Sequence, residues 1–176
     1  MSAPMRIGNI EIAPGEMKRG GIPIGKDMAG STREIPIIVY RGVEDGPCLW
    51  LNGATHGDEP EGPFSIFLAL QQLDPKKMRG TVVAVPVMNV GAFMAGTRGD
   101  PLDTFSYDMN RVYPGRADGY PTERAAAAHG AAMQETADLQ IATHSGGEHS
   151  YLAHMIFASD NDASRELAAA MGPNWT

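Results

Sequence analysis

Cys48-Leu-Trp-Leu-Asn-Gly-Ala-Thr-His-Gly-Asp-Glu59 combines an apolar strand with part of a candidate metal site. The run from Cys48 to Leu51 is continuously apolar, which is typical of a strand covered on both faces. His56 and Glu59 follow it and place an imidazole and a carboxylate three residues apart. Because this is a spacing of metal ligands, the segment predicts a strand that leads directly into two metal donors.

A strand, helix, strand unit is predicted around this segment. The apolar pattern indicates a helix over residues 62–73, which ends before Asp74-Pro75, and a second apolar strand over residues 81–88. This order favours a parallel strand pair with a right-handed crossover. The helix residues expected to cluster toward one face are Phe64, Phe67, Leu68 and Leu70.

The rest of the chain continues the alternation of strands and helices. Short strands are expected in the first part of the chain, followed later by a long irregular segment and further helices and strands. The pattern predicts an α/β fold with a mixed, mostly parallel sheet flanked by helices, in a single domain of residues 1–176. The expected strands are 7–12, 22–24, 35–40, 139–143 and 151–159, the irregular segment is 89–120, and the expected helices are 121–137 and 160–171.

The polar side chains that follow these strands predict a site at one edge of the sheet. Ligands bind at the carboxyl ends of parallel strands. His144 follows strand 139–143, as His56 follows the run from Cys48 to Leu51. Two histidines and one carboxylate, with a fourth position open, form the ligand set of a hydrolytic zinc centre. The long segment 89–120 opens onto the same edge, where it adds Arg98, Asp108, Asn110 and Arg111.

The amino-acid composition indicates which kinds of molecule this protein binds. The chain has 176 residues, 43% of them hydrophobic, and a formal net charge of -7. This acidic balance argues against a nucleic-acid or anionic-membrane surface and favours small-molecule partners. No apolar run approaches the roughly 18 residues of a membrane span, and the first residues do not resemble a secretory signal. We therefore expect a cytoplasmic enzyme, with Cys48 as an inert buried thiol. The oligomeric state cannot be inferred from the sequence.

Four ordered motifs resemble the succinylglutamate desuccinylase and aspartoacylase family, a branch of the zinc carboxypeptidase superfamily. The resemblance extends over essentially the whole chain and is greatest to the bacterial N-acetyl-diaminobutyrate deacetylase members. It implies a zinc-carboxypeptidase-like fold and a hydrolase that cleaves the amide bond of a small N-acyl amino acid. The motifs are His56-Gly-Asp-Glu59, Gly96-Thr-Arg98, Asp108-Met-Asn-Arg111 with Tyr113-Pro-Gly115, and Thr143-His144-Ser-Gly-Gly147.

The resemblance implies a Zn²⁺ ion bound by His56, Glu59 and His144. Neutral imidazoles and one carboxylate leave such an ion a Lewis acid that lowers the pKa of bound water to roughly 7. Asp108 matches the family acid that hydrogen-bonds a ligand imidazole, here His56, and fixes its tautomer. His129, on the alanine-rich helix, is interpreted as a surface or packing residue.

The resemblance also implies roles in substrate binding for the long irregular segment. Arg98 matches the arginine that polarises the scissile carbonyl and stabilises the oxyanion. Asn110 and Arg111 match the pair that holds the substrate carboxylate. An alternative for Arg98 is a loop ion pair with Asp100 or Asp103. A second alternative is that these two acids favour a cationic substrate side chain.

Two departures from the family pattern bear on activity. Ala142 stands where many relatives carry an acid two residues before the third ligand. The family's general base is a glutamate on a later strand, and no residue matches it; Glu148 is the nearest substitute in sequence. We therefore interpret the chain as the N-terminal portion of a longer catalytic domain. The alternatives are a metallocarboxypeptidase or cell-wall peptide amidase, and a zinc-binding remnant without activity.

Overall fold

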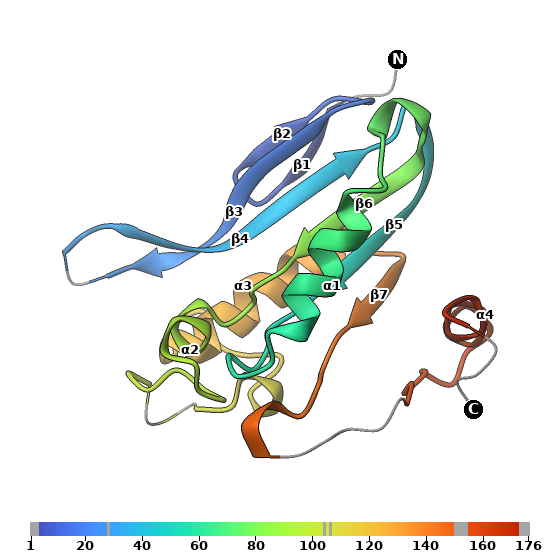
Figure 1. The fold of residues 1–176 in the computed structure, drawn as a ribbon. Helices are drawn as coiled ribbons and strands as arrows, with labels where there is room; N and C mark the ends of the chain where they lie inside the picture. Colours follow the sequence, from blue (N-terminus) through green and yellow to red (C-terminus); the bar gives the residue numbers. More distant parts are fainter. Residues whose placement is uncertain (1–3, 28, 104, 106, 150–154, 173–176) are drawn as a thin grey trace.

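A computed structural model describes residues 4–27, 29–103, 105, 107–149 and 155–172 (Figure 1). Its strands are β1 (Met5–Ile7), β2 (Ile10–Ile12), β3 (Met17–Lys26), β4 (Thr32–Arg41), β5 (Glu44–Asn52), β6 (Arg79–Val85) and β7 (Leu139–Ala142). Its α-helices are α1 (Glu61–Leu70), α2 (Val90–Ala95), α3 (Pro121–Thr136) and α4 (Asp162–Ala170), and its 3-10 turns are η1 (Pro75–Lys77), η2 (Met109–Arg111) and η3 (Gly147–His149).

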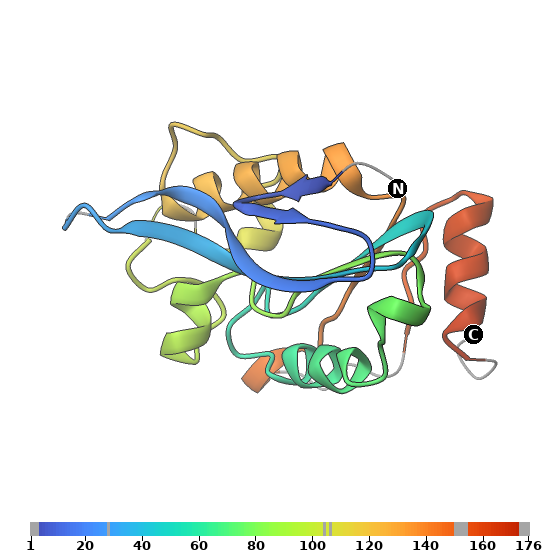
Figure 2. The same cartoon turned by 90° about the horizontal axis from the view of Figure 1, so that it is seen from above.

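The main sheet has the strand order β3-β4-β6-β5-β7. Strand β5 pairs in parallel with β6 and with β7, whereas β4 pairs antiparallel with β3 and with β6. Helix α1 covers one face, and α3 with the β1–β2 hairpin covers the other (Figure 2). The expected α/β fold with a mixed sheet flanked by helices is confirmed. Its parallel part holds the two strands that lead to the predicted histidine ligands.

The two faces of β5 and β6 supply two apolar cores. Trp50 and Val83 point to the side of α3, where both are fully buried. Leu51 and Ala84, one residue further along each strand, pack on the side of α1. This alternation follows from the two-residue period of a strand, and burial on both faces explains the continuous apolar run. Cys48 is also buried, and burial raises the pKa of its thiol to about 11, which fits the expected inert thiol.

The four residues predicted to share one apolar face of α1 do not do so, because only Leu70 among them is buried. Phe64, Phe67 and Leu68 are exposed, whereas Ile66 and Leu70 are buried. Residues three or four apart lie on the same stripe of a helix, so the exposed set forms one stripe and the buried set forms another. The step of two residues from Phe64 to Ile66 turns the second stripe to the opposite side. The stripe that faces the sheet begins with Gly62 and Pro63, and the missing side chain of Gly62 allows the first turn of α1 to approach the end of β7. A Cβ at Gly62 would lie 2.4 Å from the Thr143 hydroxyl.

Three strand predictions also differ from the structure. Residues 7–12 form a hairpin rather than one strand, because Gly8 turns the chain at a φ of 55°. The strand predicted from the apolar run of Cys48 to Leu51 is longer in the structure, because β5 begins at Glu44, and its pairing with β6 is irregular between Glu44 and Cys48. Residues 155–159 form no strand, and 151–154 lie outside the described residues. The predicted helix over 121–137 is confirmed as α3.

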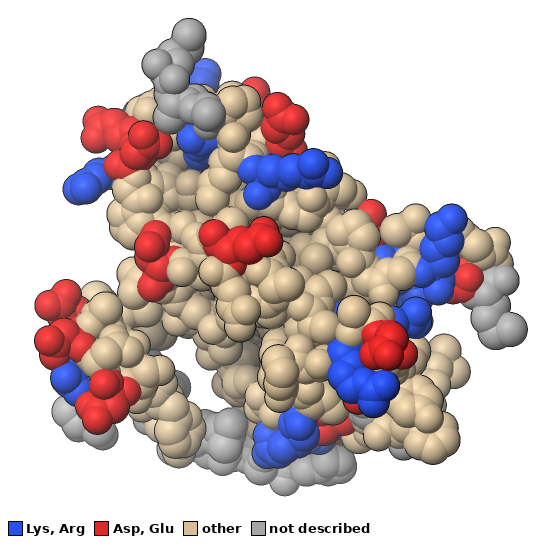
Figure 3. Space-filling view, turned by 180° about the vertical axis from the view of Figure 1, so that it is seen from behind, with Lys and Arg blue, Asp and Glu red and all other residues tan. Residues whose placement is uncertain are grey.

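Helix α4 stands apart from the sheet beyond β7, and none of its residues is buried (Figures 1 and 3). Over the described residues of the face seen in Figure 3, lysine and arginine side chains occur in separate groups interspersed with acidic ones. Among the described helices, none has the length and apolar character needed to cross a membrane.

Candidate metal centre

The loop after β5 carries His56 and is fixed to the end of β6. The amide of Gly53 donates to Val85 O, and the amide of Met88 donates to Gly53 O. Further along the loop, Gly57 lies directly against α2, where a Cβ would come within 2.0 Å of the Ala92 carbonyl carbon. This close approach explains the glycine and places His56 in a buried position at the carboxyl ends of the parallel strands.

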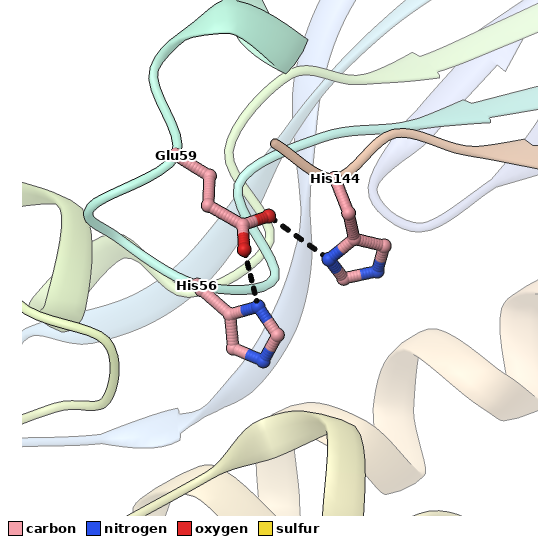
Figure 4. Close-up of side chains that lie close together, drawn as sticks. All are labelled: His56, Glu59 and His144. Carbon is pink, nitrogen blue, oxygen red and sulfur yellow. Dashed lines mark hydrogen bonds and ion pairs between the residues drawn. The ribbon is translucent and has the colours of Figure 1, made fainter. Parts of the chain in front are cut away.

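His56, Glu59 and His144 lie close together (Figure 4). His56 Nδ1 is 3.0 Å from Glu59 Oε1, and His144 Nδ1 is 2.9 Å from Glu59 Oε2. One possible ligand atom from each residue lies within 4.8 Å of the others. The side chains of His56 and Glu59 are almost fully buried, whereas that of His144 is 28% exposed. The cluster is therefore open to solvent on the His144 side.

Two backbone amides that the sequence did not point to also contact Glu59. Ser145 N donates to Oε2 and Gly146 N donates to Oε1, each at 3.2 Å. Burial by itself would raise the pKa of Glu59, but the hydrogen bonds from His144 and His56 outweigh it and hold the pKa well below its usual range. Glu59 is thus an ionised carboxylate surrounded by donors. In the sequence, the adjacent glycines Gly146 and Gly147 indicate a tight turn at this place. Both have positive φ in the structure.

Other neighbours of the cluster hold the segment after β7 against the start of α1. Ser145 Oγ donates to Glu61 Oε2 at 2.5 Å, and Glu148 N donates to Asp58 Oδ2 at 3.4 Å. A Cβ at Gly147 would lie 2.2 Å from Asp58 Oδ2, so this turn also requires a glycine. Glu148, the substitute base considered from the sequence, is exposed.

Asp108 connects the candidate cluster to Arg98. Its Oδ1 lies 3.1 Å from His56 Nε2, and its Oδ2 accepts from Arg98 Nε at 3.1 Å. Arg98 Nη2 approaches the same oxygen at 2.9 Å. Burial would raise the pKa of Asp108, but the Asn110 amide, the Arg98 guanidinium and His56 together lower it. A charged Asp108 therefore faces both the imidazole and the guanidinium.

The alternative pairing of Arg98 with Asp100 or Asp103 is wrong, because Arg98 pairs with Asp108 instead. Both of the other acids are buried and bind the backbone. Asp100 Oδ1 accepts from Leu102 N, and Asp103 Oδ2 accepts from Thr122 N in the first turn of α3.

Asn110 and Arg111 lie on η2, next to Asp108, with exposed side chains. Asn110 N donates to Asp108 Oδ1 at 2.9 Å, and Arg111 Nη1 donates to Asn110 O at 3.1 Å. Asp108, which the Asn110 amide contacts, in turn lies against His56, so η2 borders the cluster through this carboxylate. Ala142 pairs with Asn52 in the sheet, two residues before His144.

The chemistry of the donor set fits a metal ion. If Asp108 accepts the Nε2–H of His56, the tautomer is fixed and Nδ1 carries a lone pair. That lone pair then faces an ionised oxygen of Glu59 at 3.0 Å, and His144 Nδ1 faces the other oxygen. Such atoms repel one another unless a proton or a cation lies between them. A proton on each Nδ1 makes the hydrogen bonds that lower the pKa of Glu59, and a bound cation would take the place of those protons. Imidazole nitrogen and carboxylate oxygen are ligands that zinc accepts.

The fold and the cluster together define an α/β domain with a candidate metal centre at the carboxyl ends of its parallel strands. The chain belongs to the family described as the succinylglutamate desuccinylase/aspartoacylase catalytic domain, which it matches over residues 45–174. The family resemblance inferred from the sequence is thereby confirmed.

Three relatives illustrate this relationship. The chain is 36% identical over 128 residues to N-alpha-acetyl-L-2,4-diaminobutyric acid deacetylase of Halomonas elongata, covering 72% of this chain and 36% of that protein. The product-bound ectoine utilization protein EutE (DoeB) from Ruegeria pomeroyi is similar at 32% identity and a TM-score of 0.69, covering 83% of this chain and 44% of that one. An aspartoacylase family protein from Mesorhizobium loti is 28% identical with a TM-score of 0.69, covering 83% and 45%. The chain thus spans less than half the length of these relatives.

Proposed function

We propose that this chain carries the zinc-binding and substrate-anchoring part of a deacylase that hydrolyses the amide bond of a small N-acyl amino acid. The observation that carries the proposal is the convergence of one possible ligand atom each from His56, Glu59 and His144 within 4.8 Å, with both Nδ1 atoms against the Glu59 carboxylate. The similarity to a diaminobutyric acid deacetylase supports the substrate class.

The proposed metal ligands are His56, Glu59 and His144. A zinc ion bound there would supply Lewis acidity toward an amide carbonyl and toward water. The protein's own contribution is to keep Glu59 ionised, with its oxygens held by the amides of Ser145 and Gly146. Asp108 orients His56 so that Nδ1, not Nε2, faces the ligand position.

Arg98 is proposed to donate to the oxygen that becomes negative when the amide carbonyl is attacked. Its Nε and Nη2 are held by Asp108, which orients the guanidinium next to His56. Asn110 and Arg111 are proposed to hold the substrate carboxylate, because they are exposed beside the cluster and a guanidinium binds a carboxylate through two parallel hydrogen bonds.

The ligand assignment predicts that single substitutions abolish zinc binding. After dialysis against zinc and then against buffer, the wild-type chain should retain roughly one ion, as three protein donors with an open position do in catalytic sites. His56→Ala and His144→Ala should each retain almost none in elemental analysis. Glu34→Gln, a carboxylate outside the cluster, serves as the control and should retain the wild-type content. Full zinc content in either histidine variant would show that the ligand assignment is wrong.

The substrate class is tested separately on the zinc-loaded chain. Calorimetric titration with N-acetyl-L-2,4-diaminobutyrate, N-acetylaspartate and N-succinylglutamate should show binding of at least one of them, and Arg111→Ala should weaken that binding. Chromatography of the same mixtures measures hydrolysis. If none of the three binds or is cleaved while zinc is bound, these N-acyl amino acids are not its substrates.

A further inference from the structure

His129 occupies the fully buried centre of a polar network in the α3 side of the core. It is 1% exposed. Its Nδ1 lies 2.9 Å from the Tyr113 hydroxyl, and its Nε2 lies 3.3 Å from Asn52 Oδ1. Trp50 packs edge-on against the imidazole, with ring centroids 5.5 Å apart. The interpretation of His129 as a packing residue accounts for its burial, but not for two hydrogen bonds on opposite sides of the ring.

The direction of both hydrogen bonds follows from the protonation states. Burial lowers the pKa of His129 to about 4, so the ring is neutral near pH 7 and carries one N–H. Asn52 Oδ1 can only accept, so Nε2 holds the proton and Nδ1 accepts. Although Tyr113 is 38% exposed, loss of hydration at its hydroxyl raises the pKa, so the hydroxyl remains protonated and donates. The chain of donors runs from Tyr113 through His129 to Asn52.

Each end of this chain leads to a different part of the candidate site. Asn52 is the last residue of β5, and its carbonyl accepts from both the amide and the hydroxyl of Thr143, at 2.9 and 3.0 Å. Thr143 precedes His144. At the other end, Tyr113 follows η2 by two residues, and η2 carries Asn110 and Arg111. His129 is thus hydrogen-bonded both to the last residue of β5 and to the turn that contains η2 and Tyr113.

We propose that His129 is a positioning residue that fixes the substrate turn, Asp108 to Tyr113, relative to the strand ends that carry the candidate metal ligands. This inference rests on the proposed function, because it assigns the turn to substrate binding. Polar groups paired around a buried imidazole specify one geometry, since a displacement would leave a buried ring nitrogen without a partner. An apolar residue at this place would pack without defining the position of the turn.

The test removes one hydroxyl and leaves the packing unchanged. Tyr113→Phe deprives His129 Nδ1 of its donor, and the zinc-loaded variant should bind its N-acyl amino acid about ten-fold more weakly, the effect of leaving one buried acceptor unpaired. Zinc content should equal that of the wild type. Hydrogen exchange at the amides of Asn110 and Arg111 should become faster. Tyr40→Phe, on the α1 side of the sheet, is the matched control and should change none of these quantities.

A pair of variants at His129 separates positioning from general stability. His129→Gln keeps one N–H donor and one acceptor, whereas His129→Leu keeps neither. We expect the glutamine variant to recover a large part of the ligand affinity that the leucine variant loses, even where the two have similar melting temperatures. Equal affinities in the two variants would contradict a positioning role.

The outcomes distinguish this inference from the proposed function. If the zinc-loaded wild type binds the ligand and Tyr113→Phe binds it equally well, with unchanged amide exchange, His129 does not position the turn. If the wild type binds none of the three N-acyl amino acids, the proposed substrate class is wrong. In that case the exchange rates at Asn110 and Arg111 still decide the positioning role, because they require no ligand.

Discussion

Asp108 is the residue at which metal binding and substrate binding meet. One carboxylate oxygen faces His56 Nε2, and the other accepts from the Arg98 guanidinium. The amide of Asn110 donates to the same side chain. A single charge therefore orients a candidate metal ligand and a candidate catalytic guanidinium. Loss of that charge should affect both, whereas loss of Arg98 alone should leave the metal ligands in place.

We predict that Asp108→Asn weakens zinc binding about ten- to one hundred-fold, the usual effect of removing a carboxylate that orients a ligand histidine. The amide keeps the shape of the side chain but not the charge that fixes the His56 tautomer. Competition with a chromophoric chelator measures the affinity. Asp118→Asn is the control, because Asp118 is exposed and lies in an ion pair with Arg116 away from the cluster. Equal affinities in the two variants would mean that Asp108 does not orient His56.

At the scale of elements, the site depends on how closely the β5–α1 loop packs against α2. Gly57 touches the backbone of Ala92, and the loop amides bond to the end of β6. A backbone contact cannot be relieved by a change of rotamer. By contrast, Gly130 lies within α3, where a Cβ would meet only the Tyr113 ring at 3.8 Å, an ordinary contact distance.

These two glycines should respond in opposite ways to the same substitution. Gly57→Ala should lower the free energy of unfolding by about 1 to 3 kcal/mol, because helix or loop must move. It should also reduce zinc content, because His56 is the adjacent residue. Gly130→Ala should raise the free energy of unfolding by about 0.5 to 1 kcal/mol, because alanine favours the helix. Urea unfolding followed by circular dichroism measures both; a stabilised Gly57→Ala would show that this packing is not tight.

For the whole molecule, the buried imidazole of His129 makes stability depend on pH. The unfolded chain exposes a histidine with an ordinary pKa near 6.5, whereas burial lowers the pKa in the folded state to about 4. Between these values the unfolded state binds more protons, so the free energy of unfolding falls as the pH falls from 6.5 toward 4. Above pH 6.5 this residue contributes no pH dependence.

We expect His129 to lower the free energy of unfolding by roughly 2 to 3 kcal/mol between pH 7 and pH 4.5, from the shift between the two pKa values. Guanidinium unfolding at both pH values measures the loss in the wild type and in His129→Gln, which does not titrate. The variant should lose less over this interval. Parallel pH profiles in the two proteins would show that His129 is not the group responsible.

The sequence alone determined the α/β alternation, the position of α3, the identity of the family and the three donors of the candidate cluster. These features depend on local patterns and on short motifs, and the general rule that parallel strand ends share one edge was enough to join His144 to His56 and Glu59. The apolar run from Cys48 to Leu51 also indicated a strand that packs on both faces, and the structure buries Cys48 and Trp50 and half-buries Leu49 and Leu51.

Only the tertiary structure decided which face of α1 is buried, that Arg98 pairs with Asp108 rather than Asp100, and that His129 joins two parts of the site. Each of these depends on contacts between segments far apart in the chain, and the two stripes of α1 are both apolar, so periodicity could not choose between them. Packing next to β7 determines which stripe is buried. Gly62 lies against the Thr143 hydroxyl, where no larger side chain fits, and the large side chains of Phe64 and Phe67 face solvent.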